Sequence, residues 1–159
     1  YSLTETPGYL TLKCADISAT EKKTPAFVCR RLQHHKFECA TRMLFNPSND
    51  KETAGMLLFK DETHQYFLAV SRDDLGKCIT LQKVGELGAE LLVRQDIREE
   101  IKVIDLKIIS EGNYYNFYYS LMDGNWELLH KNVDASYLST SIAGGFTGTT
   151  IGLYATSEK

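Results

Sequence analysis

The feature that most constrains the fold is a series of short apolar segments, each bounded by turn-forming residues. Residues 36–45 show it best, because apolar and small residues alternate there with charged ones. One face of this segment carries Phe37, Cys39, Thr41, Met43 and Phe45. A period of two is typical of a β-strand with one buried face. Residues 54–60 are instead continuously apolar, which indicates a strand that is buried on both faces.

The same pattern continues along the chain. Further strands are expected at 65–71, 77–83, 89–95, 101–110, 114–121, 126–130 and 149–155. Asp123-Gly124 predicts a hairpin between two of them, and one helical turn is expected at 134–138 with Asp134 as its cap. About eleven short strands predict an all-β fold, a two-sheet antiparallel β-sandwich of the jelly-roll or concanavalin-A-like kind. Residues 1–159 are expected to form a single domain, a fragment of a longer chain.

Charge and hydropathy exclude several classes of partner. The chain carries 18 basic and 21 acidic side chains, a formal net charge of −3. Nucleic acid is therefore not an expected partner, since binding it usually needs a basic face. We interpret the basic cluster at 30–36 as the solvated part of two strands. No apolar window of about 18 residues exists, so no membrane contact is expected. The localisation stays open between periplasmic, secreted and cytoplasmic.

Cysteine and acidic residues give no clear metal signature. Cys14, Cys29, Cys39 and Cys78 form no Cys-x-x-Cys pair, and we interpret them as buried free thiols. No cofactor is expected. Acidic side chains in turns are the oxygen donors that calcium uses, so a structural calcium site stays open beside their interpretation as ordinary turn residues. They are Asp61, Glu62, Asp73, Asp74 and Asp123.

No catalytic residue is expected on this chain. Glu99 and Glu100 are adjacent, so they point to opposite faces of a strand and cannot act as a glycosidase carboxylate pair. The Gly-x-Ser-x-Gly nucleophile motif is absent. Tyr114, Tyr118 and Trp126 are candidates for carbohydrate contact, because sugar rings stack on flat aromatic faces. The alternative is that these three residues pack within the sheets.

Five segments, taken in order, carry a family resemblance. They are residues 7–12, 27–34, 52–59, 115–126 and 134–155, the last containing Gly-Gly-Phe-Thr-Gly at 144–148. Together they resemble the C-terminal concanavalin-A-like β-sandwich domain of glycoside hydrolase family 43, the β-xylosidases and α-L-arabinofuranosidases. The resemblance spans nearly the whole chain.

The resemblance implies a division of labour. In that family the catalytic carboxylates lie in a separate five-bladed β-propeller upstream, and none of them can be placed here. The chain would be a non-catalytic accessory domain, inactive alone, that packs on the propeller of an enzyme acting on xylo- or arabino-oligosaccharides. In some members a loop aromatic approaches the active-site pocket. The matching pocket-closing loop here is Gly144, Gly145, Phe146 and Thr147, and the alternative is that Phe146 tucks into the sandwich. A carbohydrate-binding, lectin-like module is the alternative function.

Overall fold

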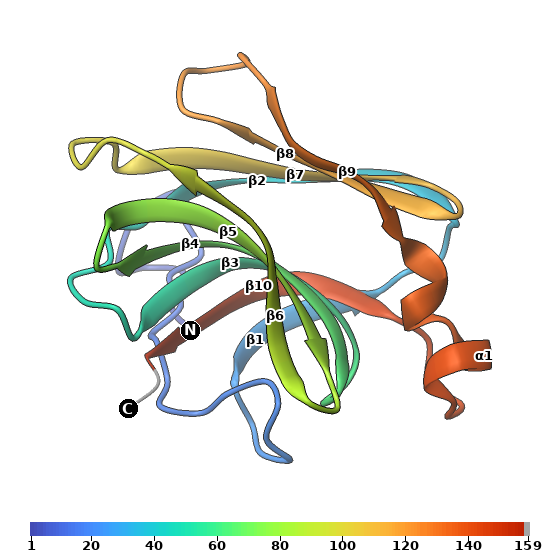
Figure 1. Ribbon diagram of the computed structural model, residues 1–159. Coiled ribbons are helices and arrows are strands. Elements are labelled where there is room, and N and C mark those ends of the chain that lie inside the picture. The colour runs from blue at the N-terminus through green and yellow to red at the C-terminus, as the bar shows by residue number, and fades with distance from the viewer. Residues whose placement is uncertain (158–159) are drawn as a thin grey trace.

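Two antiparallel sheets pack face to face in the computed structural model, which describes residues 1–157 (Figure 1). The larger sheet has the order β1-β10-β3-β4-β5-β6, and the smaller has the order β2-β7-β8-β9. The strands of the larger sheet are β1 (Ala26–Arg31), β10 (Thr150–Ser157), β3 (Glu52–Asp61), β4 (His64–Asp73), β5 (Gly76–Gly85) and β6 (Gly88–Asp96). Those of the smaller sheet are β2 (Lys36–Leu44), β7 (Val103–Glu111), β8 (Tyr114–Ser120) and β9 (Glu127–Asp134). The expected all-β sandwich is confirmed.

Local elements follow the sequence pattern closely. The hairpin of β8 and β9 forms around Asp123-Gly124. The expected helical turn is the 3₁₀ helix η1 (Ala135–Leu138), where the Asp134 carboxylate accepts from the Ser136 N–H at 2.8 Å. A second short helix, α1 (Thr140–Ala143), was not expected. Within residues 1–157 there are ten strands rather than about eleven, since residues 1–25 form only isolated bridges.

The main core fills the space between the sheets. Its fully buried side chains come from the inner faces of central strands, and they include Leu58, Leu68, Leu81, Leu106 and Phe117. A second, smaller cluster lies on the outer face of the larger sheet, where Leu57, Phe67 and Tyr154 pack with Ala19 of the N-terminal segment (residues 1–25). This second layer explains why β3 is buried on both faces, as its continuous apolar run predicts.

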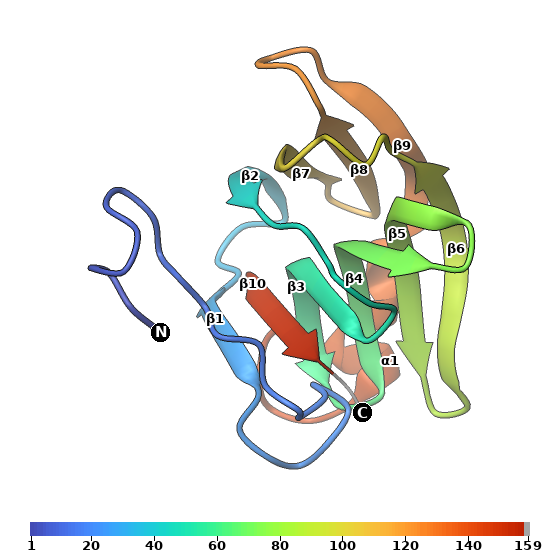
Figure 2. The same cartoon turned by 90° about the vertical axis from the view of Figure 1, so that its left-hand side faces the viewer.

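Two further sequence expectations concern membrane contact and the cysteines. No helix in the described part of the chain is long and apolar enough to cross a membrane. All four cysteines are free, but they are not uniformly buried. Cys78 is buried and Cys29 is exposed, because Cys29 lies on the edge strand β1, which has a neighbour on one side only. Figure 2 shows the start of the N-terminal segment extending beyond β1, away from the sheets.

Candidate functional site

The loop between α1 and β10 projects from one end of the sandwich. Gly144 ends α1, and its N–H donates to the Thr140 carbonyl oxygen at 2.9 Å. Gly144 and Gly145 then take φ values of 73° and 72°, a region that favours glycine because it has no Cβ. A Cβ built on either residue would meet no atom within 4 Å. The two glycines therefore shape the loop through their backbone angles alone.

Both ends of this loop are held by hydrogen bonds, while its tip is free. The buried Lys60 ammonium donates to the Thr147 carbonyl oxygen. The Thr149 hydroxyl donates to the Leu138 carbonyl oxygen at 2.9 Å, and the Thr149 carbonyl accepts from the Leu32 N–H at 2.9 Å. Phe146 lies between the Gly144 hydrogen bond and these contacts, and it has a relative exposure of 108%. Its ring does not pack into the sandwich, so the alternative considered from the sequence is excluded.

The three candidate carbohydrate-contact aromatics lie on or beside the smaller sheet, away from that loop. The Lys107 ammonium lies 4.3 Å from the centroid of the Trp126 ring and 5.4 Å from that of Tyr118. Trp126 is half-buried and outside the main core, whereas Tyr114 is exposed at the start of β8. Tyr118 and Trp126 therefore both lie near the Lys107 ammonium, which sits over the Trp126 ring.

The acidic turn residues are mostly engaged with basic side chains. Asp61 bonds the His64 Nδ1 atom at 2.9 Å, and Asp123 pairs with Arg42. Arg94 donates two hydrogen bonds to Asp73 and lowers the pKa of that carboxyl. Among residues 1–157, no group of three or more His, Cys, Asp or Glu side chains could hold a metal ion.

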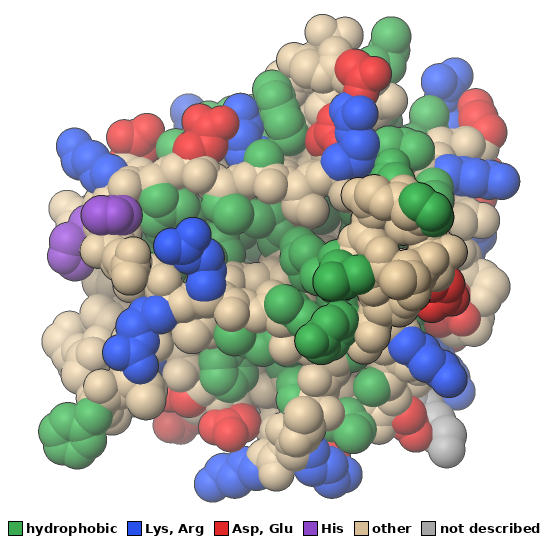
Figure 3. All heavy atoms as spheres, turned by 180° about the vertical axis from the view of Figure 1, so that it is seen from behind, with side chains coloured by type: hydrophobic (Ala, Val, Ile, Leu, Met, Phe, Trp, Pro, Cys, Tyr) green, Lys and Arg blue, Asp and Glu red, His purple; other side chains and the backbone are tan. Residues whose placement is uncertain are grey.

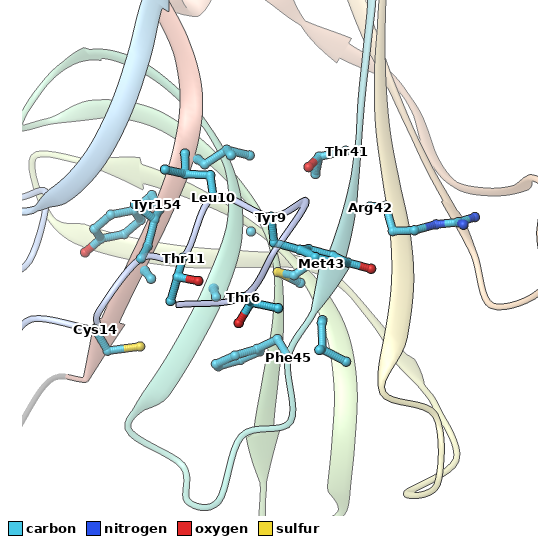
Figure 4. Close-up of a pocket in the computed structure, with 16 residues that line it drawn as sticks. Thr6, Tyr9, Leu10, Thr11, Cys14, Thr41, Arg42, Met43, Phe45 and Tyr154 are labelled. Atoms are coloured by element: carbon cyan, nitrogen blue, oxygen red, sulfur yellow. The ribbon is translucent and has the colours of Figure 1, made fainter. Parts of the chain in front are cut away.

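A cavity that sequence reasoning missed lies where the N-terminal segment crosses the side of the sandwich. Its volume is about 190 Å³, and Figure 4 shows Tyr9 and Leu10 of the N-terminal segment near Met43 and Phe45 of β2 and its end. The alternation in β2 was a signal that these side chains face inward. No local sequence pattern indicated that the inner face of β2 would be only partly covered by other side chains.

The geometry can now be compared with known proteins. The sequence model described as the beta-xylosidase C-terminal concanavalin A-like domain matches residues 1–159. The chain belongs to this domain family. The family resemblance found in the sequence is thus confirmed, and the projecting loop with Phe146 lies in a C-terminal domain of glycoside hydrolase family 43.

Two curated relatives of this domain are similar along nearly its whole length. A xylosidase/arabinosidase of Butyrivibrio fibrisolvens is 35% identical over 161 residues, which cover 99% of this chain and 30% of the relative. A beta-xylosidase of Bacillus subtilis is 30% identical over 158 residues, covering 96% of this chain and 30% of the relative. The domain thus spans about a third of the length of these relatives.

Solved structures of the family agree with the fold. The GH43 BlXynB protein from Bacillus licheniformis superposes with a TM-score of 0.88 at 25% identity, covering 99% of this chain and 31% of that one. The Bacteroides ovatus protein described as xyloglucan PUL GH43B gives a TM-score of 0.90 at 25% identity, covering 98% and 30%. This C-terminal domain therefore has the family's concanavalin A-like sandwich.

Proposed function

We propose that this domain is a non-catalytic part of a xylosidase or arabinofuranosidase, that it packs on the catalytic propeller of the same chain, and that Phe146 closes part of the substrate pocket. The observation that carries the proposal is the loop. A fully exposed aromatic ring stands at its tip, with the Gly144 hydrogen bond before it and the contacts of Thr147 with Lys60 and of Thr149 with Leu138 after it. The substrate class comes from the relatives, whose names include xylosidase and arabinosidase.

The physical argument rests on exposed apolar area. A fully exposed phenylalanine gains about 1.5–3 kcal/mol when a partner covers it. At the mouth of a pocket the same ring would also remove water from around the scissile bond, which strengthens electrostatic interactions there. The hydrogen bonds at the loop's ends reduce the entropy lost when the tip is ordered against substrate.

The test is Phe146→Ala in the full-length enzyme, with kcat and KM measured on aryl xylosides and aryl arabinofuranosides. The matched control is Leu87→Ala, because Leu87 is 105% exposed in the turn between β5 and β6. We expect Phe146→Ala to lower kcat/KM by about tenfold, which is 1.4 kcal/mol of transition-state stabilisation, and Leu87→Ala to leave it unchanged. Equal kinetics in the two variants would contradict the pocket-closing role.

A second candidate function is carbohydrate binding by the smaller sheet. It is favoured by the grouping of Tyr118 and Trp126 around Lys107, with Tyr114 exposed on the same strand as Tyr118. Retention of the full-length protein by insoluble xylan and arabinoxylan tests it. A binding module predicts that Trp126→Ala weakens retention, whereas a purely accessory domain predicts no difference between this variant and Leu87→Ala.

A further inference from the structure

An open furrow separates the edge strands β1 and β2 of the two sheets. Neither strand has a second neighbour in its own sheet. The furrow has a volume of about 350 Å³, and its lining combines β1, β2 and the core strands behind them. Figure 3, which views the molecule from behind, shows hydrophobic side chains in a hollow between the two layers, with basic side chains nearby. This side of the sandwich is incompletely closed.

The inner face of β2 shows the consequence. Every second residue of β2 is only half-buried, although these side chains point toward the core. In a closed sandwich, inner-face residues interdigitate with those of the opposite sheet and become fully buried. Here Met56 and Ile151 form part of the furrow's lining, and Val28 on β1 keeps 40% of its exposure. The furrow is thus an apolar surface that no other part of the described chain covers.

Two further hollows involve the segments that flank β1 and β2. The 190 Å³ cavity under the N-terminal segment shares Thr41 and Leu153 with it. At the other end a hollow of about 270 Å³ is lined by Leu32, Leu138 and Thr149, residues that include the anchors of the Phe146 loop. The furrow is therefore continuous with the cavity under the N-terminal segment, whereas the third hollow shares no lining residue with it.

The rim of the furrow is basic. Arg30 lines the furrow and is exposed on β1, and within residues 1–157 its side chain forms no hydrogen bond or ion pair. Arg31 points to the opposite face of β1, where its side chain lies near Gly148. His34, His35 and Lys36 are exposed after the two arginines. By contrast, Arg42 across the furrow is held in a bidentate pair with Asp105. A surface that covers the furrow is expected to supply carboxylate or carbonyl oxygens to the unpaired Arg30 guanidinium group.

We infer that this furrow is the docking surface of the catalytic domain, which inserts an apolar ridge between β1 and β2 and places an acidic group against Arg30. The inference rests on the proposed function. The family description places this domain at the C-terminal end of β-xylosidases, and the matched relatives are about three times as long. A second copy of the chain fits less well, because a symmetric contact would bring two basic rims together.

Site-specific thiol labelling in the full-length protein tests the inference. Val28→Cys places a thiol in the furrow, and Leu91→Cys is the matched control on β6, the opposite edge of the same sheet. Val28 and Leu91 are 40% and 53% exposed, so both thiols should react readily if nothing covers them. Maleimide labelling of each position is followed by mass spectrometry of its peptide, with rates normalised to those in denaturant.

We expect the Val28→Cys thiol to react at least about tenfold more slowly than the Leu91→Cys thiol in a protein that native mass spectrometry shows to be monomeric. Equal labelling rates would contradict docking at the furrow. They would not contradict the proposed function, which the kinetics of Phe146→Ala test independently. Protection that disappears on dilution, together with dissociation of a dimer, would also contradict docking of the catalytic domain there, in favour of a second copy.

Discussion

The ammonium of Lys60 donates a hydrogen bond to the carbonyl oxygen of Thr147, the residue that follows Phe146. Lys60 lies in β3 and is only 4% exposed, so a central strand of the larger sheet fixes the position of an otherwise free loop tip. This contact links two parts of the chain that are 87 residues apart.

Lys60→Met removes the donor and keeps the apolar stem. We expect faster hydrogen exchange at residues 144–149 and a fall in kcat/KM of the full-length enzyme in the same direction as Phe146→Ala. Lys51→Met, at an exposed lysine before β3, is the control. Hydrogen bonds to charged groups contribute about 1.5–3 kcal/mol, but relief of ammonium burial offsets part of the loss here. Unchanged exchange at the loop would show that Lys60 does not position it.

Gly144→Ala is expected to lower the free energy of unfolding by about 1–3 kcal/mol. The reason is conformational, since Gly144 has φ 73° and ψ −162°, a combination that is essentially restricted to glycine. Gly148→Ala is the control, because Gly148 has no positive φ and its nearest neighbours lie 3.7 Å away in the Arg31 side chain. Urea denaturation of both variants measures the difference, and equal midpoints would rule out backbone strain at Gly144.

Tyr154→Phe is expected to destabilise the domain by about 1–3 kcal/mol, because it leaves a buried N–H without its acceptor. The Tyr154 hydroxyl accepts from the Ala19 N–H at 3.0 Å, and both residues are buried. The local effect should be faster hydrogen exchange at Ala19, where the N-terminal segment covers the larger sheet. Tyr114→Phe, at an exposed tyrosine, should change neither stability nor exchange. Slow hydrogen exchange at Ala19 in Tyr154→Phe would show that the Tyr154 hydroxyl does not hold the N-terminal segment in place.

Asp73→Asn is expected to reduce stability near neutral pH and to lose its effect in acid. Hydrogen bonds from Arg94 lower the pKa of Asp73, so the folded state favours the ionised carboxylate. That stabilisation is present above the unfolded pKa of about 3.9 and disappears as the pH falls through the lower folded value.

The measurement is the midpoint of urea denaturation from about pH 7 down to about pH 2, through the unfolded pKa and toward the lower folded one. Asp74→Asn, at the next exposed carboxylate of the same turn, is the control. A difference between Asp73→Asn and the unmodified protein that persists at the acid end would argue against ionisation of Asp73 as its origin.

Much of the fold could be predicted because its signals are local. The alternation in residues 36–45 and 114–121 reflects which side chains face the core, and this pattern survives in β2 and β8. Asp123-Gly124 and the cap at Asp134 act within a few residues of themselves, so the turn and the 3₁₀ helix were predictable.

The sequence by itself therefore determined the class of fold, the positions of most strands and the family. Only the tertiary structure decided that β10 lies between β1 and β3, that Lys107 lies over the Trp126 ring, and that the inner face of β2 is left half-open. The physical reason is range. Strand alternation and turn chemistry act between near neighbours, whereas sheet order and the exposure of an edge depend on contacts between residues far apart in the chain, such as Arg30 and Ile151.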